Sequence, residues 1–349
     1  MTTNGHSHTN GTGVVRPLTP GIYAPIPTFF VPDSEDLDIP SFEAHVTRVG
    51  LAGVGILVCG SMGEAPHLSH EERVILIKAA RRALDKAGLH HAPIVAGTGS
   101  HSLRETLHLT RAAAQAGADY SIVICSGYFA GAIANDKQAL KAFWSEVAAK
   151  SPIPVIIYNY PAACGGIDLD SDTIEELAQE NPNLCGVKLT CGNVGKLTRI
   201  AATVSVPSFD KSYPRQNPNA PFLVLGGYTD FIVPSAFARA HGAITGLANV
   251  APHACARLHE LSQAAVSDLT LLPAAQALQD VIARADRTMA LASISGTKAT
   301  LERLYGYGGL PRKPLPPFPK EKADILWAHP NVVELVRVER ELSGKIASK

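Results

Sequence analysis

The stretch VGILVC at residues 54–59 is apolar throughout, and so are YSIVIC at 120–125 and PVIIY at 154–158. These runs do not alternate apolar with polar residues, as a strand with one solvent-exposed face does. Continuous apolar runs of this length are typical of parallel strands that are covered on both faces. The three runs therefore predict a parallel sheet buried under helices.

Runs of this kind recur along the chain at intervals of 21 to 39 residues, which is room for a strand, a helix and two loops. They start near Ile22, Val54, Pro93, Tyr120, Pro154, Cys185, Phe222 and Ala243. Between them, Ser69 with Glu72 and Ser102 with Glu105 have the spacing of helix capping boxes. Eight such units predict an α/β fold, a closed (β/α)8 TIM barrel. An open doubly wound sheet is the alternative, but no Gly-rich dinucleotide fingerprint follows the early strands.

The barrel is predicted to span residues 17–250. Residues 1–16 are small and polar with a single arginine, which predicts a disordered tail. Residues 204–221 hold four prolines and predict a surface excursion before the seventh strand. Residues 251–349 predict a helical C-terminal region, in which the Pro-rich segment 311–319 forms an extended link. Its helices are expected at 251–265, about 270–290, 295–305 and 321–343.

Composition excludes several classes of protein. The 349 residues include 31 Lys+Arg and 31 Asp+Glu, so there is no basic footprint for nucleic acid or an anionic membrane. No apolar run reaches the ~18 residues of a membrane span. The six cysteines form no CxxC pair and predict a reduced intracellular enzyme. No secretory signal is visible and the N-terminal tail is not Arg-rich, so we expect a cytoplasmic rather than a mitochondrial protein.

Lys188 is the most informative residue of the chain. The reactive groups of such a barrel lie at the carboxyl ends of its strands, and Lys188 stands at the end of the apolar sixth run, LCGVKLT. Burial disfavours the charged form of a lysine, and a neutral amine can attack a carbonyl. The alternative is an ammonium that reaches the barrel rim while its stem is buried.

Further polar groups are expected beside Lys188 at the carboxyl ends of the barrel strands. Tyr158 ends the neighbouring fifth run and could pass protons to and from an imine. The alternative is a tyrosine that packs as an aromatic with its hydroxyl hydrogen-bonded, which is commoner in strands. Ser61 follows the second run in a Gly-flanked turn whose backbone N–H groups could hold a carboxylate. Glu64 is expected to order that turn rather than to act as an acid.

Three blocks in combination resemble the dihydrodipicolinate synthase / N-acetylneuraminate lyase family. They are GSMGEAPHLSHEER at residues 60–73, YNYPAACGGIDL at 158–169 and GVKLTCGN at 186–193. The resemblance extends from about Pro20 through the helical C-terminal region. It implies imine chemistry on pyruvate without a metal or an organic cofactor. It also implies a small 2-oxo acid as substrate and a homo-oligomer, a dimer or a tetramer.

The resemblance also implies roles for individual residues. Lys188 would form the imine with the 2-oxo group of pyruvate, and Tyr158 would be the proton shuttle beside it. Ser61 would bind the carboxylate and relay protons, and Tyr128 would complete that relay. The pyruvate pocket would be lined by Met62, Gly227 and Ile244 together with Ser61.

Departures from the family pattern restrict the class of substrate that we expect. Dihydrodipicolinate synthases carry an arginine for the aldehyde's carboxylate where this chain has Ala163. Met62 replaces the second hydroxyl of the usual Thr-Thr pair, and Phe129 leaves only one phenol after the fourth strand. The branch that the chain most resembles is that of eukaryotic 4-hydroxy-2-oxoglutarate aldolases and fungal 2-keto-3-deoxy-sugar-acid aldolases.

The expected function is therefore a class I aldolase that splits a 4-hydroxy-2-oxo acid into pyruvate and an aldehyde. The alternatives are a condensing enzyme or hydratase of the same family, and a non-catalytic barrel that binds 2-oxo acids.

Overall fold

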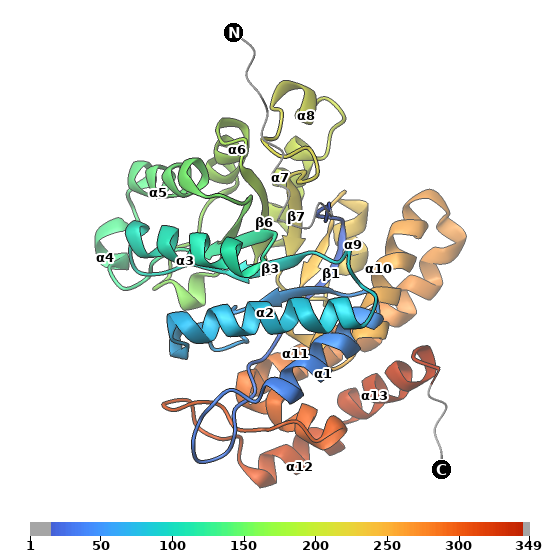
Figure 1. The fold of residues 1–349 in the computed structure, drawn as a ribbon. Helices are drawn as coiled ribbons and strands as arrows, with labels where there is room; N and C mark the ends of the chain where they lie inside the picture. The colour runs from blue at the N-terminus through green and yellow to red at the C-terminus, as the bar shows by residue number, and fades with distance from the viewer. Residues whose placement is uncertain (1–14, 345–349) are drawn as a thin grey trace.

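A computed structural model describes residues 15–344, and its centre is a closed barrel of eight parallel strands in sequence order (Figure 1). Each strand begins within one residue of a predicted start. The predicted (β/α)8 barrel is therefore confirmed. The strands are β1 Gly21–Pro25, β2 Gly55–Val58, β3 Ile94–Gly97, β4 Tyr120–Ile124, β5 Val155–Asn159, β6 Leu184–Leu189, β7 Leu223–Gly226 and β8 Gly242–Ile244.

Helices follow the strands and cover the outside of the barrel (Figure 1). Ser69 forms the complete predicted capping box with Glu72. Ser102 also caps its helix, but Glu105 does not bond back to it and pairs with His70 at 2.6 Å. The helices are α1 Ile39–Leu51, α2 His70–Lys86, α3 Leu103–Ala116, α4 Ala130–Ile133, α5 Lys137–Lys150, α6 Ser171–Glu180, α7 Val194–Val204, α8 Phe209–Ser212, α9 Ile232–Phe237, α10 Pro252–Ser267, α11 Leu272–Tyr305, α12 Lys320–Ala328 and α13 Pro330–Leu342. The excursion predicted before the seventh strand contains α8.

Side chains alternate between the barrel interior and the helical layer, as they do along any strand. In β5, Ile157 packs into the layer between strands and helices, whereas Ile156 and Tyr158 belong to the interior cluster. In β6, Val187 packs outward and its neighbour Lys188 therefore points inward. This alternation places a lysine and a tyrosine side by side inside the barrel.

The N-terminal prediction needs one correction. Most of the predicted disordered tail lies outside the described residues, but Arg16 is part of the folded barrel. Its guanidinium donates to the carbonyl of His90 at 2.7 Å and pairs with Asp119 at 3.3 Å. Its own carbonyl accepts a hydrogen bond from the Tyr120 hydroxyl at 2.8 Å. The folded chain thus begins before the predicted boundary at residue 17.

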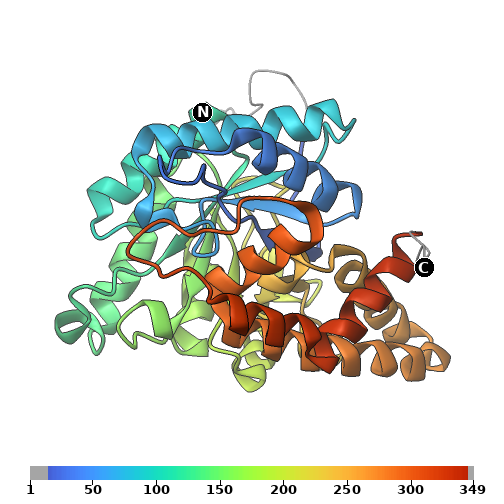
Figure 2. The same ribbon diagram turned by 90° about the horizontal axis from the view of Figure 1, so that it is seen from below.

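The predicted boundary between the barrel and the C-terminal helices, at residue 250, lies just before α10. Helix α10 follows β8 and packs beside α9 and β1, which is the position of the eighth barrel helix, and it also packs against α11 and α13. The packing therefore connects the barrel and the C-terminal helices through α10. The break expected between residues 290 and 295 is a kink inside α11, where Ser293 has φ 58° and ψ −157°. Figure 2 shows α11, α12 and α13 lying across one side of the barrel.

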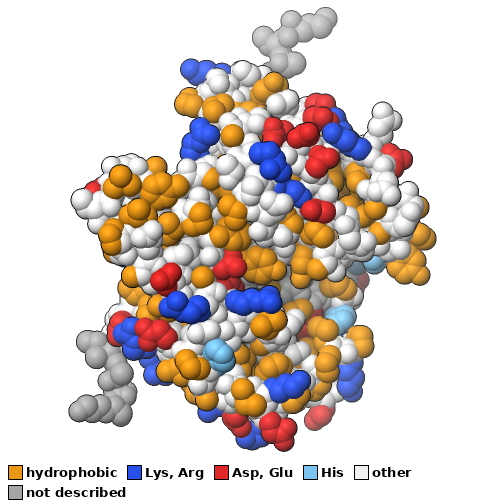
Figure 3. Space-filling view, turned by 180° about the vertical axis from the view of Figure 1, so that it is seen from behind, with side chains coloured by type: hydrophobic (Ala, Val, Ile, Leu, Met, Phe, Trp, Pro, Cys, Tyr) orange, Lys and Arg blue, Asp and Glu red, His pale blue; other side chains and the backbone are white. Residues whose placement is uncertain are grey.

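Positive and negative side chains occur together on one face of the molecule. On the face drawn in Figure 3, Lys and Arg side chains are interspersed with Asp and Glu side chains and with apolar ones. Among residues 15–344, no helix is both long and apolar enough to span a bilayer. Within the same residues, no three His, Cys, Asp or Glu side chains gather in a way that could hold a metal ion.

Candidate active site

Lys188 and Tyr158 are neighbours across two strands. They are register partners in the parallel pair β5–β6, and Lys188 Nζ lies 4.2 Å from the centroid of the Tyr158 ring. Both side chains are buried, and Lys188 as a whole is 5% exposed. The alternative of an ammonium reaching solvent at the barrel rim is therefore wrong, because the side chain stays inside the barrel.

Burial shifts the proton affinity of both groups. Loss of solvation lowers the pKa of Lys188 to about 7, so a large share of the amine is neutral at physiological pH. Burial also raises the pKa of Tyr158 to about 12, although the nearby hydroxyls of Ser61 and Thr190 oppose the rise. The phenol therefore keeps its proton at neutral pH. The pair consists of a potential nucleophile and a potential proton donor.

A cavity of about 480 Å³ opens above this pair at the carboxyl ends of the strands. Lys188 and Tyr158 line it together with four further residues that the sequence singled out: Ser61, Met62, Gly227 and Ile244. The structure thus brings six of the seven predicted site residues to one cavity.

Tyr128 is the exception. Its side chain is 78% exposed and packs against His101 and Phe129 rather than lining the cavity. The expectation that it completes the proton relay is not met within a single chain. The loop after β4 contributes Ser126 and Gly127 to the cavity wall instead.

Thr190 was missed by the sequence reasoning. It follows Lys188 by two residues and lines the cavity, and its buried Oγ1 makes no hydrogen bond of good geometry within the described chain. A Cβ added at Gly227 would lie 2.3 Å from this Oγ1, so the two backbones approach closely here. The period-2 alternation of a strand was a signal that could have found Thr190.

Helix α11 supplies one wall of the cavity, which local sequence patterns could not reveal. The lining includes Asp286, Met289, Ser293 and Thr297 from this helix. The buried Asp286 carboxylate accepts hydrogen bonds from the backbone N–H and the hydroxyl of Thr229, at 2.6 and 2.8 Å. It thereby fixes the turn that follows β7.

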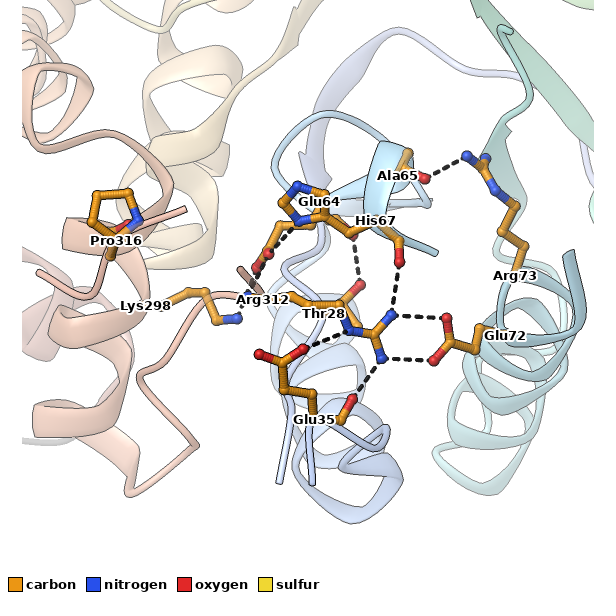
Figure 4. Close-up of polar contacts among 12 residues, drawn as sticks. Thr28, Glu35, Glu64, Ala65, His67, Glu72, Arg73, Lys298, Arg312 and Pro316 are labelled. Carbon is orange, nitrogen blue, oxygen red and sulfur yellow. Dashed lines mark hydrogen bonds and ion pairs between the residues drawn. The ribbon is translucent and has the colours of Figure 1, made fainter. Parts of the chain in front are cut away.

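Glu64 orders the turn after β2, as expected (Figure 4). Its carboxylate pairs with Lys298 Nζ at 2.9 Å and accepts the backbone N–H of Arg312 at 2.8 Å. The turn itself is held from the other side by Thr28, whose hydroxyl donates to the carbonyl of Gly63 at 2.7 Å. These contacts position Ser61.

The model of the Dihydrodipicolinate synthetase family matches residues 46–328. The chain belongs to this family. Within the family, it is 39% identical over 336 residues to the L-threo-3-deoxy-hexylosonate aldolase of Aspergillus niger, covering 93% of this chain and 98% of that protein. It is 40% identical over 332 residues to the probable mitochondrial 4-hydroxy-2-oxoglutarate aldolase of Emericella nidulans, covering 95% and 99%.

Solved structures of dihydrodipicolinate synthetase family proteins agree with this assignment. One from Coccidioides immitis superposes with a TM-score of 0.78 at 34% identity, covering 94% of this chain and 99% of that one. The YagE protein of Escherichia coli K12, solved in complex with pyruvate, superposes with a TM-score of 0.75 at 25% identity, covering 93% and 99%. The resemblance inferred from the three sequence blocks is thereby confirmed.

Proposed function

We propose that the chain is a class I aldolase, a carbon–carbon lyase that cleaves a 4-hydroxy-2-oxo acid to pyruvate and an aldehyde. The observation that carries this proposal is the buried amine of Lys188 beside the Tyr158 phenol in the cavity at the carboxyl ends of the strands. The aldolase names of the Aspergillus and Emericella relatives support it. The reaction needs an amine that is neutral before it attacks, and the burial of Lys188 supplies one.

In this proposal, Lys188 Nζ attacks the 2-oxo carbon of the substrate, and loss of water gives a protonated imine. A base takes the proton of the 4-hydroxyl, the C3–C4 bond breaks, and its electron pair moves into the imine as the aldehyde leaves. Protonation of C3 gives the imine of pyruvate, which water hydrolyses to pyruvate and free Lys188. We assign the proton transfers to Tyr158: its phenol protonates the hydroxyl that leaves as water when the imine forms, and the resulting phenolate takes the proton of the 4-hydroxyl and later returns it to C3. We assign binding of the substrate carboxylate to Ser61 and its turn.

The cavity favours a neutral, hydroxylated aldehyde half over one that carries a carboxylate. Besides Lys188, the described lining contains one Lys or Arg side chain, Arg73, and its guanidinium donates to the carbonyls of Gly97 and Ala65. Ala163 lines the cavity where dihydrodipicolinate synthases have their arginine clamp. The lining also holds His101, His70 paired with Glu105 at 2.6 Å, and the carboxylate of Asp286, together with hydroxyl groups from Ser100, Ser126, Tyr160, Tyr228 and Ser293.

A substrate panel tests the proposal. Purified protein is incubated with a 2-keto-3-deoxy sugar acid and with 4-hydroxy-2-oxoglutarate, and both pyruvate and the aldehyde are measured. We expect pyruvate and an equal amount of aldehyde, with the higher kcat/KM for the sugar acid, and no product from Lys188→Ala. Water loss without an aldehyde would indicate a hydratase, and pyruvate binding without any product would indicate a non-catalytic barrel.

We also propose a homo-oligomer in the cytoplasm. All six cysteines are free, which suits a reducing compartment. The Emericella relative is named mitochondrial, so cell fractionation of the tagged protein has to separate the two locations. Light scattering after size exclusion would give the mass in solution. A monomer mass at micromolar concentration would reject the oligomer.

A further inference from the structure

A buried ion pair joins the C-terminal helices to the turn after β2. Lys298 comes from α11, and its Nζ lies 2.9 Å from Glu64 Oε1, with both side chains fully buried. The same Nζ lies 4.6 Å from the centroid of the Phe30 ring. Neither Lys298 nor Glu64 is among the residues that line the cavity. Any effect on the reaction must therefore act through other residues.

Glu64 is the residue at which the carboxylate-binding turn ends. Its backbone has φ 55°, a left-handed conformation that is uncommon for a residue other than glycine. Its second carboxylate oxygen accepts the Arg312 backbone N–H and lies 3.2 Å from His67 Nδ1. The sequence immediately before it is Gly60–Gly63, which presents Ser61 to the cavity. The position of the Glu64 carboxylate thus determines where the turn lies.

Arg312 reinforces this attachment from outside (Figure 4). Its guanidinium forms two hydrogen bonds with the Glu72 carboxylate, at 2.7 and 2.9 Å. It also donates to the carbonyls of His67 at 2.8 Å and Glu35 at 2.5 Å. The segment after α11 is therefore bound both to the turn and to the start of α2.

The burial of the pair limits how far the turn can move. A charged pair without water is stable only when the partners stay in contact, because separation leaves an unpaired charge in a low-dielectric interior. An apolar pair would fill the same space without this requirement on geometry. Moving the turn away from α11 would therefore leave Glu64 and Lys298 as unpaired buried charges.

We propose that Lys298 is a positioning residue, whose ion pair with Glu64 holds the Gly60–Gly63 turn in the shape that binds the carboxylate of the 2-oxo acid. This inference rests on the proposed function. Lys298 does not touch the substrate and takes no part in the bond-breaking steps. Its removal should therefore weaken the binding of pyruvate more than it slows the chemistry on bound substrate.

The test is borohydride trapping of the pyruvate imine across a range of pyruvate concentrations. In Lys298→Met, we expect the half-saturating pyruvate concentration to rise about ten-fold or more, because Glu64 loses its partner and draws the turn toward water. The fraction trapped at saturation should stay close to that of the wild type, since Lys188 is intact. In the aldolase assay, KM should rise more than kcat falls.

Two further variants separate positioning from general damage. In the double variant Glu64→Gln/Lys298→Met, no unpaired charge remains and the amide still accepts the Arg312 N–H, but the ion pair to α11 is lost. Half-saturation should therefore fall below that of Lys298→Met and stay about three-fold or more above that of the wild type. Lys320→Met makes the same change on an exposed lysine of α12 and should leave half-saturation unchanged. If Lys298→Met does not fold, Lys298→Gln is measured in its place with the same expectation.

Unchanged half-saturation in the folded Lys298 variant would overturn the inference. A double variant that binds pyruvate as well as the wild type, or no better than the single variant, would overturn it too. Failure of the proposed function is recognised separately, because the wild-type protein would then give no adduct on Lys188 at any pyruvate concentration.

Discussion

Lys188 owes its predicted reactivity to its surroundings and not to a specific charged partner. Burial alone lowers its pKa to about 7, against roughly 10.4 for a free lysine. An exposed lysine is neutral in about one molecule in 2,500 at pH 7, so burial increases the reactive fraction by a factor on the order of a thousand. Burial inside the closed barrel is thus what makes the amine reactive.

The rate of imine formation should therefore depend on pH through this amine. The protonated form cannot attack, so the rate at low pyruvate should rise from about pH 6 and level off above about pH 8. The expected midpoint is near the pKa of Lys188, about 7. Rapid borohydride quenching at each pH measures it. A midpoint above pH 9, as for an exposed lysine, would contradict the account.

Tyr158→Phe should slow cleavage by about 10²–10⁴-fold, because it removes the phenol that carries protons. Initial rates of pyruvate release measure the effect. Tyr23→Phe is a matched control, since its hydroxyl donates to the Thr19 carbonyl at 2.8 Å and Tyr23 does not line the cavity. An equal loss in both variants, or unchanged turnover in Tyr158→Phe, would rule out the shuttle role.

At the residue level, the sequence could predict the side-chain contacts that follow from strand order and register. Lys188 and Tyr158 end neighbouring strands, so their contact follows from the order and the alternation of the strands. Tyr128 lies in a loop beyond its strand, where no periodicity fixes the direction of a side chain. For that reason the expected place of Tyr128 at the cavity is not found within a single chain, and its part in the relay stays a prediction.

At the level of elements, the contact between the ends of β6 and β7 shapes the pocket floor. Gly227 lies against Thr190 so closely that an added Cβ would stand 2.6 Å from the Thr190 Cα. A backbone atom cannot move aside as the end of a flexible side chain can. The absence of a side chain at Gly227 is therefore a requirement of the site.

Gly227→Ala should consequently lower kcat/KM by about 10²-fold, because the shift needed to relieve the clash displaces groups beside Lys188 by a fraction of an ångström or more. Gly131→Ala is the control, since a Cβ there meets nothing within 4 Å. Aldolase kinetics on both variants, with circular dichroism to verify folding, would decide. Equal activities would show that the close approach is irrelevant to the site.

The positions of the strands were predictable because buried parallel strands are continuous apolar runs with recognisable breaks. The walls of the cavity were less predictable. Asp286 and Ser293 stand in α11, where the sequence predicts helices and a break between them, but their approach to the cavity depends on tertiary packing. Nothing in the sequence near Ser293 sets the direction that α11 takes after its kink.

On the scale of the whole molecule, the C-terminal helices share a hydrophobic cluster with strands β1, β2, β3 and β8 of the barrel. A single cluster of buried residues includes Ile22 of β1, Val46 of α1, Leu301 of α11 and Leu335 of α13. Such a continuous core predicts one cooperative unfolding unit rather than a barrel with an independent appendage. The sequence indicated both regions, but it could not show that they are packed into one body.

Leu335→Ala should therefore destabilise the entire protein, by about 2–5 kcal/mol for a fully buried leucine. Urea unfolding of the variant, followed by far-ultraviolet circular dichroism and by tryptophan fluorescence, should give one coincident transition. In a Trp327→Phe background, Trp144 of the barrel layer is the remaining fluorophore. If Trp144 reported an unshifted midpoint, the C-terminal helices would be a separate unit.

The most direct test of the central claim is to locate the pyruvate adduct by mass spectrometry. Protein incubated with pyruvate and reduced with borohydride is digested, and its peptides are compared with those of an unreduced sample. We expect the peptide containing Lys188, and no other, to be heavier by the mass of pyruvic acid less one oxygen. An adduct on another lysine, or none on the folded protein, would contradict it.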